Sequence, residues 1–296
     1  MGPTVSDVPV RDAGAPEGVD DREEPVVGDP GVAVIAGSAT DAEGAGRPAK
    51  LVVSGVTKRF GGRAGEVMAL DDVSLHVDDG ELVCLLGASG CGKSTLLSII
   101  GGLESPTSGE VRVEGDRVIG PGADRGMVFQ AYSLYPWATV AGNIGWGLQV
   151  AGWSKQRRAE RVEELLGIMS LTEFADALPK ELSGGMRQRV AIARALAPEP
   201  DVLLLDEPFG ALDAQTKRHL QDFLLEVWAR TGVTILMVTH DVEEAVYLSS
   251  RVYVMSPRPG RMAEEVVVPF GRGRGASIKR DPRFLDLRDE LADLLA

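Results

Sequence analysis

A glycine-rich segment, Gly87 to Ser94, carries the strongest chemical signal in the sequence. It fits the pattern G-x-x-x-x-G-K-[ST], with an apolar run before it and apolar residues at helical spacing over 96–100. In such a strand–loop–helix unit, small residues allow successive N–H groups to turn inward around an anion at the positive helix end. The sequence therefore predicts a phosphate-binding loop formed by Gly87, Ala88, Ser89, Gly90, Cys91, Gly92, Lys93, Ser94 and Thr95.

Two side chains at the end of this loop have expected chemical roles. Lys93 is suited to bridge the β- and γ-phosphates of a nucleotide, and the Ser94 hydroxyl is suited to coordinate Mg²⁺. The plain alternative is a glycine-rich turn with an exposed lysine. The flanking strand and helix favour phosphate binding.

A pair of carboxylates follows a second apolar run, Val202 to Leu205. Four continuous apolar residues predict a strand buried on both faces, and ligands of open parallel sheets bind at the carboxyl end of the strands. Asp206 is suited to hold Mg²⁺, and Glu207 to polarise an attacking water as a general base. Taken alone, the pair could equally be a solvated acidic turn.

A serine followed by two glycines, Ser183 to Gly185, begins a further stretch of helical texture. Ser183 is a natural N-cap, and the glycines leave the following N–H groups open, so a second anion site is predicted without a lysine of its own. Taken alone, this motif is more simply a helix cap. His240 follows the apolar run 234–238, which places it at the same sheet edge as Asp206.

The elements expected around these residues alternate between strand and helix. Apolar runs predict strands over 51–56, 67–77, 81–86, 202–205, 233–239 and 251–255, with Phe60 to Gly62 joining the first two. Helical spacing predicts helices over 155–169, 215–230 and 242–248, an amphipathic helix from about Pro282, and a mainly helical stretch from about 138 to 182. The alternation implies an α/β fold with a mostly parallel sheet covered by helices.

Composition and charge exclude several classes of protein. The 296 residues carry 31 Lys and Arg against 44 Asp and Glu, a net charge of −13 that opposes general binding to nucleic acid. Residues 1–50 hold ten acidic and four basic residues with little apolar content, which predicts a disordered acidic N-terminal extension. No apolar run approaches the roughly 20 residues that span a bilayer, and the N-terminus has no signal-peptide pattern. Cys84 and Cys91 match neither a zinc nor a redox spacing, which favours a reducing compartment.

Taken together, these motifs resemble those of the ATP-binding subunits of ABC transporters. The shared features, in order, are the phosphate loop, Gln130, Leu182 to Gln188, Asp206-Glu207, Asp213 and His240. The resemblance covers about residues 51–270, and the serine–glycine–glycine motif separates this family from other P-loop NTPases. It implies a P-loop NTPase core with an antiparallel β subdomain and an α-helical subdomain at about 138–182, followed by a C-terminal tail, residues 271–296, with an amphipathic helix.

The resemblance also implies roles for single residues. Phe60 is expected to stack on adenine, Gln130 to sense Mg²⁺ and the attacking water, Asp213 to couple two sites, and His240 to hold the γ-phosphate. Without the family, Phe60 reads as a core aromatic and Gln130 as an exposed loop residue. The expected catalytic residues are Glu207, His240, Lys93 and Gln130; the expected magnesium ligands are Ser94, Gln130 and Asp206; the signature motif is Leu182, Ser183, Gly184, Gly185 and Met186. Met186 stands where glutamine is commonest in the family.

The family implies an assembly as well as a site. ATP bound by the phosphate loop of one chain is expected to be capped by Ser183 and Gly185 of a second copy in a head-to-tail homodimer, with Mg²⁺ as cofactor. Further expected partners are an integral-membrane permease and, through it, a periplasmic or lipid-anchored substrate-binding protein. The expected location is the cytoplasmic face of a bacterial membrane, and no nucleic-acid partner is expected.

The segments Val128 to Trp137 and Met255 to Arg261 resemble those of importer ATPases for nitrate, aliphatic sulfonates and taurine. Residues 132–143 are expected to line the groove that receives the permease, with Trp137 offering apolar area. The basic residues 272, 274, 279, 280 and 283 are interpreted as solvated charge or a lipid-edge contact. Two alternatives stay open: an ABC ATPase acting on nucleic acid or ribosomes, and a binding role with ATP as structural ligand.

Overall fold

The computed structural model describes residues 49–62 and 65–295. All of the described elements belong to one compact unit. The predicted acidic extension lies outside the described residues, except that Ala49 and Lys50 already belong to the first strand.

A six-stranded sheet carries the expected parallel core. Its strand order is β10-β9-β3-β8-β7-β6, and every neighbouring pair is parallel except β10 with β9. The predictions of β3, β7, β8 and β9 are confirmed to within one residue at each end. The strand bounds are β3 (Leu82–Gly87), β6 (Arg125–Val128), β7 (Val202–Asp206), β8 (Thr234–Thr239), β9 (Arg251–Met255) and β10 (Met262–Val267).

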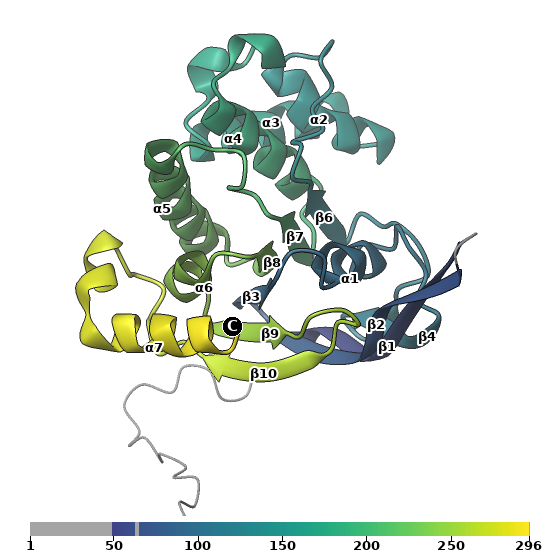
Figure 1. Cartoon of the computed structure of the whole chain (residues 1–296). Coiled ribbons are helices and arrows are strands. Elements are labelled where there is room, and N and C mark those ends of the chain that lie inside the picture. Colours follow the sequence, from purple (N-terminus) through teal and green to yellow (C-terminus); the bar gives the residue numbers. More distant parts are fainter. Residues whose placement is uncertain (1–48, 63–64, 296) are drawn as a thin grey trace, which may run out of the picture. The chain divides into compact units, whose positions relative to one another are not determined.

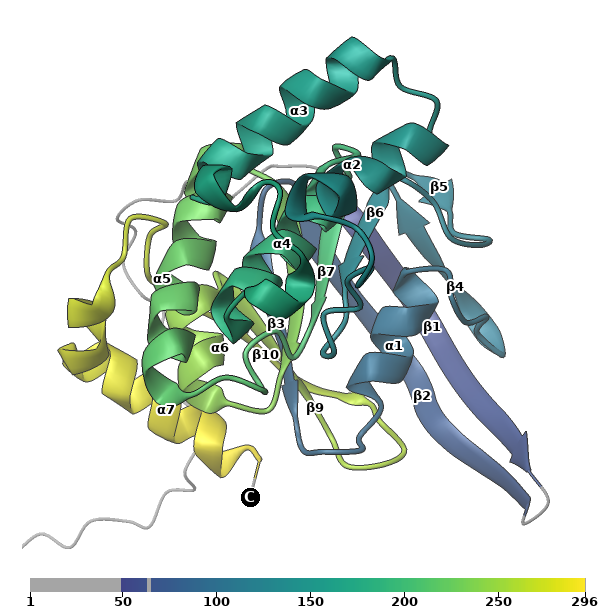
Figure 2. The ribbon, with the colours of Figure 1, turned by 90° about the horizontal axis from the view of Figure 1, so that it is seen from above.

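Both faces of this sheet are covered, as continuous apolar strands require. Successive residues of β7 alternate between two cores: Leu203 and Leu205 face one, while Val202 and Leu204 face the other. The first core includes α5 (Ala214–Thr231) and α6 (Val242–Leu248). The second includes α1 (Lys93–Ile100), which packs between this sheet and the second sheet of the molecule (Figure 1, Figure 2).

The second sheet is antiparallel, with the order β2-β1-β4-β5. Its strands are β1 (Ala49–Gly62), β2 (Gly65–Asp78), β4 (Ser108–Val113) and β5 (Asp116–Arg117). The expectation that Phe60 to Gly62 forms the connection is wrong, because Phe60 pairs with Val67 inside the β1–β2 ladder. Register shifts beside Gly55, whose φ is +58°, break the alternation on which the shorter prediction depended.

A helical segment extends from the edge of the parallel sheet. It contains α2 (Val140–Val150), α3 (Lys155–Ile168), the short 3-10 turns η1 (Thr172–Phe174) and η2 (Pro179–Glu181), and α4 (Gly184–Leu196). Hydroxyl oxygens of Thr139, Ser154 and Ser183 accept from N–H groups of the first turns of α2, α3 and α4. The predicted cap at Ser154 is thereby confirmed. No described helix has the length and apolar character that a membrane span requires.

The C-terminal residues fold onto the first core through η3 (Ala276–Arg280) and α7 (Pro282–Asp293). Phe284, Leu287 and Leu291 are buried there, and α7 runs beside α6 (Figure 1). The predicted amphipathic helix is confirmed.

Of the two alternatives left open for the basic residues in this segment, solvated charge does not describe three of the five. Arg272 donates to the carbonyl oxygen of Gly80, Arg274 to that of Ser249 at 2.8 Å, and Lys279 to Glu243 at 2.9 Å. These contacts fasten the segment to the core, and burial lowers the pKa of Arg274 to about 10.

Candidate active site

The phosphate loop connects the end of β3 to the start of α1, as the motif predicts. Gly90 and Gly92 have φ angles of +78° and +113°. A Cβ at Gly92 would lie 2.8 Å from Leu70 Cδ2 and 2.9 Å from the Ala69 carbonyl oxygen, so the loop needs glycine there for both conformation and space. The Lys93 ammonium donates to Gly87 O at 2.8 Å and Ala88 O at 3.0 Å, which places this cation at the loop.

Cys91 lies inside the loop as a small filler. Its side chain is 1 % exposed, and its sulfur would lie 2.9 Å from a Cβ placed on Gly87. The neighbouring Gly260 approaches closely too, since a Cβ there would lie 2.2 Å from Cys91 O. The loop is thus held between β2 and the β9–β10 connection.

Two oxygen donors suited to Mg²⁺ meet beside the loop. The Ser94 hydroxyl donates to Asp206 Oδ1 at 2.9 Å, which joins the start of α1 to the end of β7. Burial raises the pKa of Asp206, the Ser94 hydrogen bond opposes the rise, and the nearby charge of Glu207 adds to it. A divalent cation would offset this desolvated charge, so the donor set fits a hard cation held partly by protein and partly by nucleotide oxygens.

Glu207 and His240 form a pair at the same edge. Glu207 has a left-handed φ of +44°, and its Oε2 lies 3.1 Å from His240 Nδ1. The Glu207 N–H donates to Val238 O of β8 at 3.1 Å, which anchors this unusual backbone to the neighbouring strand. Glu207 therefore turns away from Asp206 and reaches the loop that follows β8.

Gln130, which follows β6, completes the group. A Cβ placed on Gly210 would lie 3.6 Å from Gln130 Nε2 and 3.7 Å from Glu207 Oε2, so both side chains flank Gly210. Tyr132 and Ser133, just beyond, both adopt left-handed φ angles of +58° and +47°. Arg194 of α4 donates to their carbonyl oxygens at 3.2 and 2.7 Å and holds this strained turn.

Phe60 lies on β1, which pairs with the strand that packs against the phosphate loop. Its partner across the ladder, Val67, belongs to β2, whose Ala69 and Leu70 pack on Gly92. The Phe60 ring is 41 % exposed, with Lys58 Nζ 4.8 Å from its centre. Phe60 is therefore not a core aromatic, and its ring has exposed surface on which a flat group can stack.

The signature residues are not joined to the phosphate loop within the chain. Ser183 accepts from Met186 N at 3.3 Å at the start of α4, and a Cβ on Gly185 would lie 2.9 Å from Thr216 Cγ2 of α5. Among residues 49–62 and 65–295, no hydrogen bond or ion pair connects 182–186 with 87–95. Ser183 itself is exposed and free to face another molecule.

Asp213 begins α5, and its carboxylate accepts from Thr216 N at 3.0 Å and Gln215 N at 3.1 Å. Hydrogen bonds from Thr216 and then Gln215 lower the pKa of Asp213. In the structure it is an N-cap of the helix that starts next to Gly185.

A cluster that the sequence did not reveal lies behind His240. Lys217 Nζ lies 2.7 Å from Asp241 Oδ2 and 2.6 Å from Glu244 Oε1. Burial disfavours the charge of Lys217, but these two carboxylates outweigh it and raise its pKa. The partners are 24 and 27 positions apart in sequence, so no local pattern signals them. In the sequence, Asp241 is marked only by its position next to His240.

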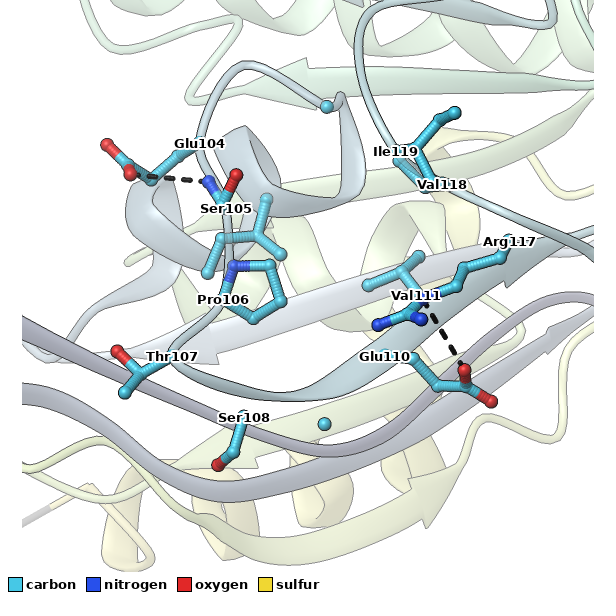
Figure 3. Close-up of a pocket in the computed structure, with 13 residues that line it drawn as sticks. Glu104, Ser105, Pro106, Thr107, Ser108, Glu110, Val111, Arg117, Val118 and Ile119 are labelled. Atoms are coloured by element: carbon cyan, nitrogen blue, oxygen red, sulfur yellow. Dashed lines mark hydrogen bonds and ion pairs between the residues drawn. The ribbon is translucent and has the colours of Figure 1, made fainter.

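A separate cavity of about 420 Å³ lies between the end of α1 and β4. Pro106, Val111 and Ile119 line it, and Glu110 faces Arg117 across it at 3.6 Å (Figure 3). None of the predicted site residues lines this cavity.

Comparison with known proteins agrees with this geometry. The family model described as ABC transporter matches residues 70–210. The nitrate import ATP-binding protein NrtD of Synechocystis sp. (strain ATCC 27184 / PCC 6803 / Kazusa) is 50% identical, over 83% of this chain and 94% of the relative. The taurine import ATP-binding protein TauB of Burkholderia pseudomallei (strain K96243) is 47% identical, over 83% of this chain and 97% of the relative.

Solved structures agree as well. A dimeric structure of MJ0796, a bacterial ABC transporter cassette, matches with a TM-score of 0.65 and 34% identity, over 75% of this chain and 100% of that chain. The same cassette has been solved in a post-hydrolysis state bound to ADP and Pi. The fold and site thus define an ATP-binding cassette, and the chain belongs to the ABC transporter family. Its activity is ATP hydrolysis coupled to transport, with a membrane permease as partner, which confirms the family, fold and enzyme class expected from the sequence.

Proposed function

We propose that this chain energises the uptake of a small anion, of the nitrate, sulfonate or taurine type, through a separate membrane permease. The support is its similarity over most of its length to a nitrate import and a taurine import ATP-binding protein. A periplasmic or lipid-anchored binding protein would deliver the anion to the permease. The chain itself would sit peripherally at the cytoplasmic face of the membrane.

One observation supports the proposed chemistry: six polar side chains lie at one sheet edge, just beyond the ends of four adjacent strands. They are Lys93, Ser94, Gln130, Asp206, Glu207 and His240. Such convergence at the carboxyl ends of parallel strands is where ligands of this sheet class bind. The glycine loop would hold the phosphates of ATP, and Phe60 would stack on its base. Ser94 and Asp206 would hold Mg²⁺, with Gln130 as the further expected ligand, and the bound ion would neutralise phosphate charge.

Glu207 is the proposed general base, because its carboxylate is held but not fully buried and, among residues 49–62 and 65–295, forms no ion pair with a lysine or arginine. Its hydrogen bond to His240 orients it, and Gln130 on the other side of Gly210 can position the water that Glu207 deprotonates. His240 and Lys93 would contact the γ-phosphate and stabilise the charge that develops there.

A second copy would complete the site. Ser183 is exposed and caps its own helix, away from the phosphate loop of its own chain. In a head-to-tail dimer, the motif Leu182, Ser183, Gly184, Gly185 and Met186 would close over ATP held by the partner copy, and Asp213, next to it, would couple the two sites. The dimeric structures of the cassette MJ0796 support this arrangement.

An aromatic patch is the proposed permease contact. Trp137 is 70 % exposed and Trp146 41 % exposed, and Tyr135 lies between them with ring centres at 5.5 and 5.1 Å. The patch lies on the turn after Gln130 and on α2, so a permease helix bound there would act on the residues that reach the site.

The decisive experiment is uptake into proteoliposomes that hold the cognate permease, this chain and ATP. We expect uptake of nitrate, taurine or an alkane sulfonate with the wild-type chain, and none with Glu207→Gln, which retains ATP binding but lowers turnover about 10²-fold or more. The matched control is Glu226→Gln, an exposed position on α5. ATPase activity stimulated by ribosomes or nucleic acid but not by the permease would favour the alternative class.

A further inference from the structure

We propose that Lys217 is a positioning residue for His240: it ties the loop that carries His240 to the start of α5 and holds the imidazole at hydrogen-bond distance from Glu207. This inference rests on the proposed role of His240 in hydrolysis. It assigns to Lys217 a function that neither the phosphate loop nor the signature motif supplies.

The side chain of His240 is held by little else. It is 58 % exposed, and its one hydrogen bond in the described part of the chain goes to Glu207, at 3.1 Å. Its position therefore depends on the backbone of the two residues beside it, Thr239 and Asp241. Thr239 and Asp241 are themselves held by hydrogen bonds and an ion pair.

These neighbours belong to a closed ring of contacts. The Thr239 hydroxyl donates to Glu244 Oε2 at 2.5 Å and accepts from Asp241 N at 3.0 Å, and Asp241 Oδ1 accepts from Glu244 N at 3.2 Å. Lys217 Nζ then bridges Asp241 Oδ2 and Glu244 Oε1. The residue before His240 and the residue after it are thus both connected to one ammonium group on a different helix.

A cation is needed at this place. Glu244 is 5 % exposed, and Asp241 lies beside it at the start of α6. Two neighbouring carboxylates without a counter-charge repel each other, and one that is buried carries a large desolvation cost. Loss of the ammonium group would therefore push Asp241 outward and carry His240 with it.

Lys217 also reaches the other side of the site. It lies in the first turn of α5, where its N–H donates to Asp213 O at 2.9 Å. A small cavity of about 110 Å³ separates the segment 207–212 from the His240 loop, and Lys217 lines it together with Glu207, Gly210 and Asp241. The lysine spans this gap, so a movement at the Asp213 cap is transmitted to His240 without passing through the sheet.

Lys279 provides a matched control. Its ammonium group pairs with Glu243 of the same helix α6 at 2.9 Å, lies 4.3 Å from the Tyr247 ring centre and donates to Gln221 Oε1 at 3.4 Å. In the described part of the chain it forms no hydrogen bond or ion pair with Asp241 or Glu244. Both lysines fasten α6 to another part of the fold. Of these two lysines, Lys217 pairs directly with the carboxylates that hold the His240 loop, whereas Lys279 reaches Glu244 only through the side-chain amide of Gln221.

The experiment compares the purified full-length variants Lys217→Met, Lys217→Arg, Lys279→Met and His240→Ala, each assayed for MgATP binding, kcat, KM and melting temperature. We expect Lys217→Met to lower kcat about 10- to 100-fold, the effect of a misplaced group near reacting atoms, while KM changes less than about twofold. Lys217→Arg, which keeps the charge, should recover most of the loss. Lys279→Met should keep wild-type kcat whatever its melting temperature.

Wild-type kcat in folded Lys217→Met, or equal losses in Lys217→Met and Lys279→Met, would overturn the inference. If Lys217→Met does not fold, Lys217→Met/Glu244→Gln removes the unpaired buried charge and still cuts the link, and the same expectations apply to it. His240→Ala separates the two levels: if it retains full activity, the proposed role of His240 fails, whereas its inactivation beside an active Lys217→Met refutes the positioning role alone.

Discussion

At the scale of single residues, the ionised carboxylate of Asp206, an expected magnesium ligand, lowers the stability of the protein without metal. Its pKa is raised above the ordinary value of 3.8, chiefly by burial. When a carboxyl group has a higher pKa in the folded than in the unfolded protein, deprotonation destabilises the folded state. The protein therefore loses stability as the pH rises from the ordinary pKa through the raised one. At neutral pH, the ionised side chain therefore destabilises the nucleotide-free protein.

We accordingly expect Asp206→Asn to melt at a higher temperature than the wild type at pH 7 while losing Mg²⁺-dependent hydrolysis. The advantage in melting temperature should shrink as pH falls towards the acid range, where the wild-type carboxyl is protonated. Thermal unfolding of the nucleotide-free chains across pH measures this. Asp176→Asn, at an exposed position, is the control, and a lower melting temperature for Asp206→Asn at pH 7 would contradict the argument.

Lys93 has a different signature. Its ammonium group lies against Gly87 O and Ala88 O and supplies the positive charge of the loop. A charge-assisted hydrogen bond contributes about 1.5 to 3 kcal/mol, so Lys93→Ala should weaken ATP binding about 10- to 150-fold. Titration with a fluorescent ATP analogue measures the change, with the exposed Lys155→Ala as control. Equal affinities of the two variants would remove Lys93 from the phosphate site.

At the scale of elements, α7 is a part of the core rather than an appendage. The side chain of Leu291 is fully buried in the core, whereas that of Leu294, one turn later, is 43 % exposed. Truncating a buried leucine to alanine lowers the free energy of unfolding by about 2 to 5 kcal/mol, whereas truncating an exposed leucine changes it by no more than about 0.5 kcal/mol. Leu291→Ala should therefore unfold at clearly lower denaturant concentration than Leu294→Ala. Similar midpoints would mean that α7 detaches in solution.

The predictability of each element follows from where its partners lie. Strands β3, β7 and β8 are buried on both faces, so their continuous apolar runs mark them without further information. The edge strand β10 has three exposed residues in a row and pairs with β9 alone, so nothing in its own sequence distinguishes it from a loop. The extra length of β1 depends likewise on its ladder with β2.

The site divides in the same way. The phosphate loop, Asp206 and His240 are predictable because each directly follows an apolar strand, and parallel strands end at one edge. Lys217 and Arg194 were missed because their partners are carboxylates and carbonyl oxygens far away in the sequence. A residue that holds a candidate catalytic group in place has no sequence motif when the contact is formed only by the fold.

At the scale of the whole molecule, the proposed assembly makes a prediction that no single-chain enzyme shares. If ATP lies between the phosphate loop of one copy and Ser183 of another, Lys93→Ala and Ser183→Arg each disable both sites of their own homodimer. In a mixed dimer the two defects fall on the same site. The other site then combines the intact loop of the Ser183→Arg chain with the intact signature of the Lys93→Ala chain.

Mixing the two inactive proteins in equal amounts should therefore restore hydrolysis. Random pairing gives half heterodimers, each with one intact site, so activity on the order of a quarter of the wild type is expected if the sites act independently. The assay is ATP turnover after co-refolding or subunit exchange, with each variant alone and a mixture of Lys93→Ala with Glu207→Gln as controls. In that second mixture, Lys93 and Glu207 belong to the same half of a site, the half that carries the phosphate loop. Each chain therefore brings a damaged half to its site, and both sites of every dimer stay defective. Restoration in the first mixture but not in the second requires that the serine and the lysine act on one nucleotide from different chains.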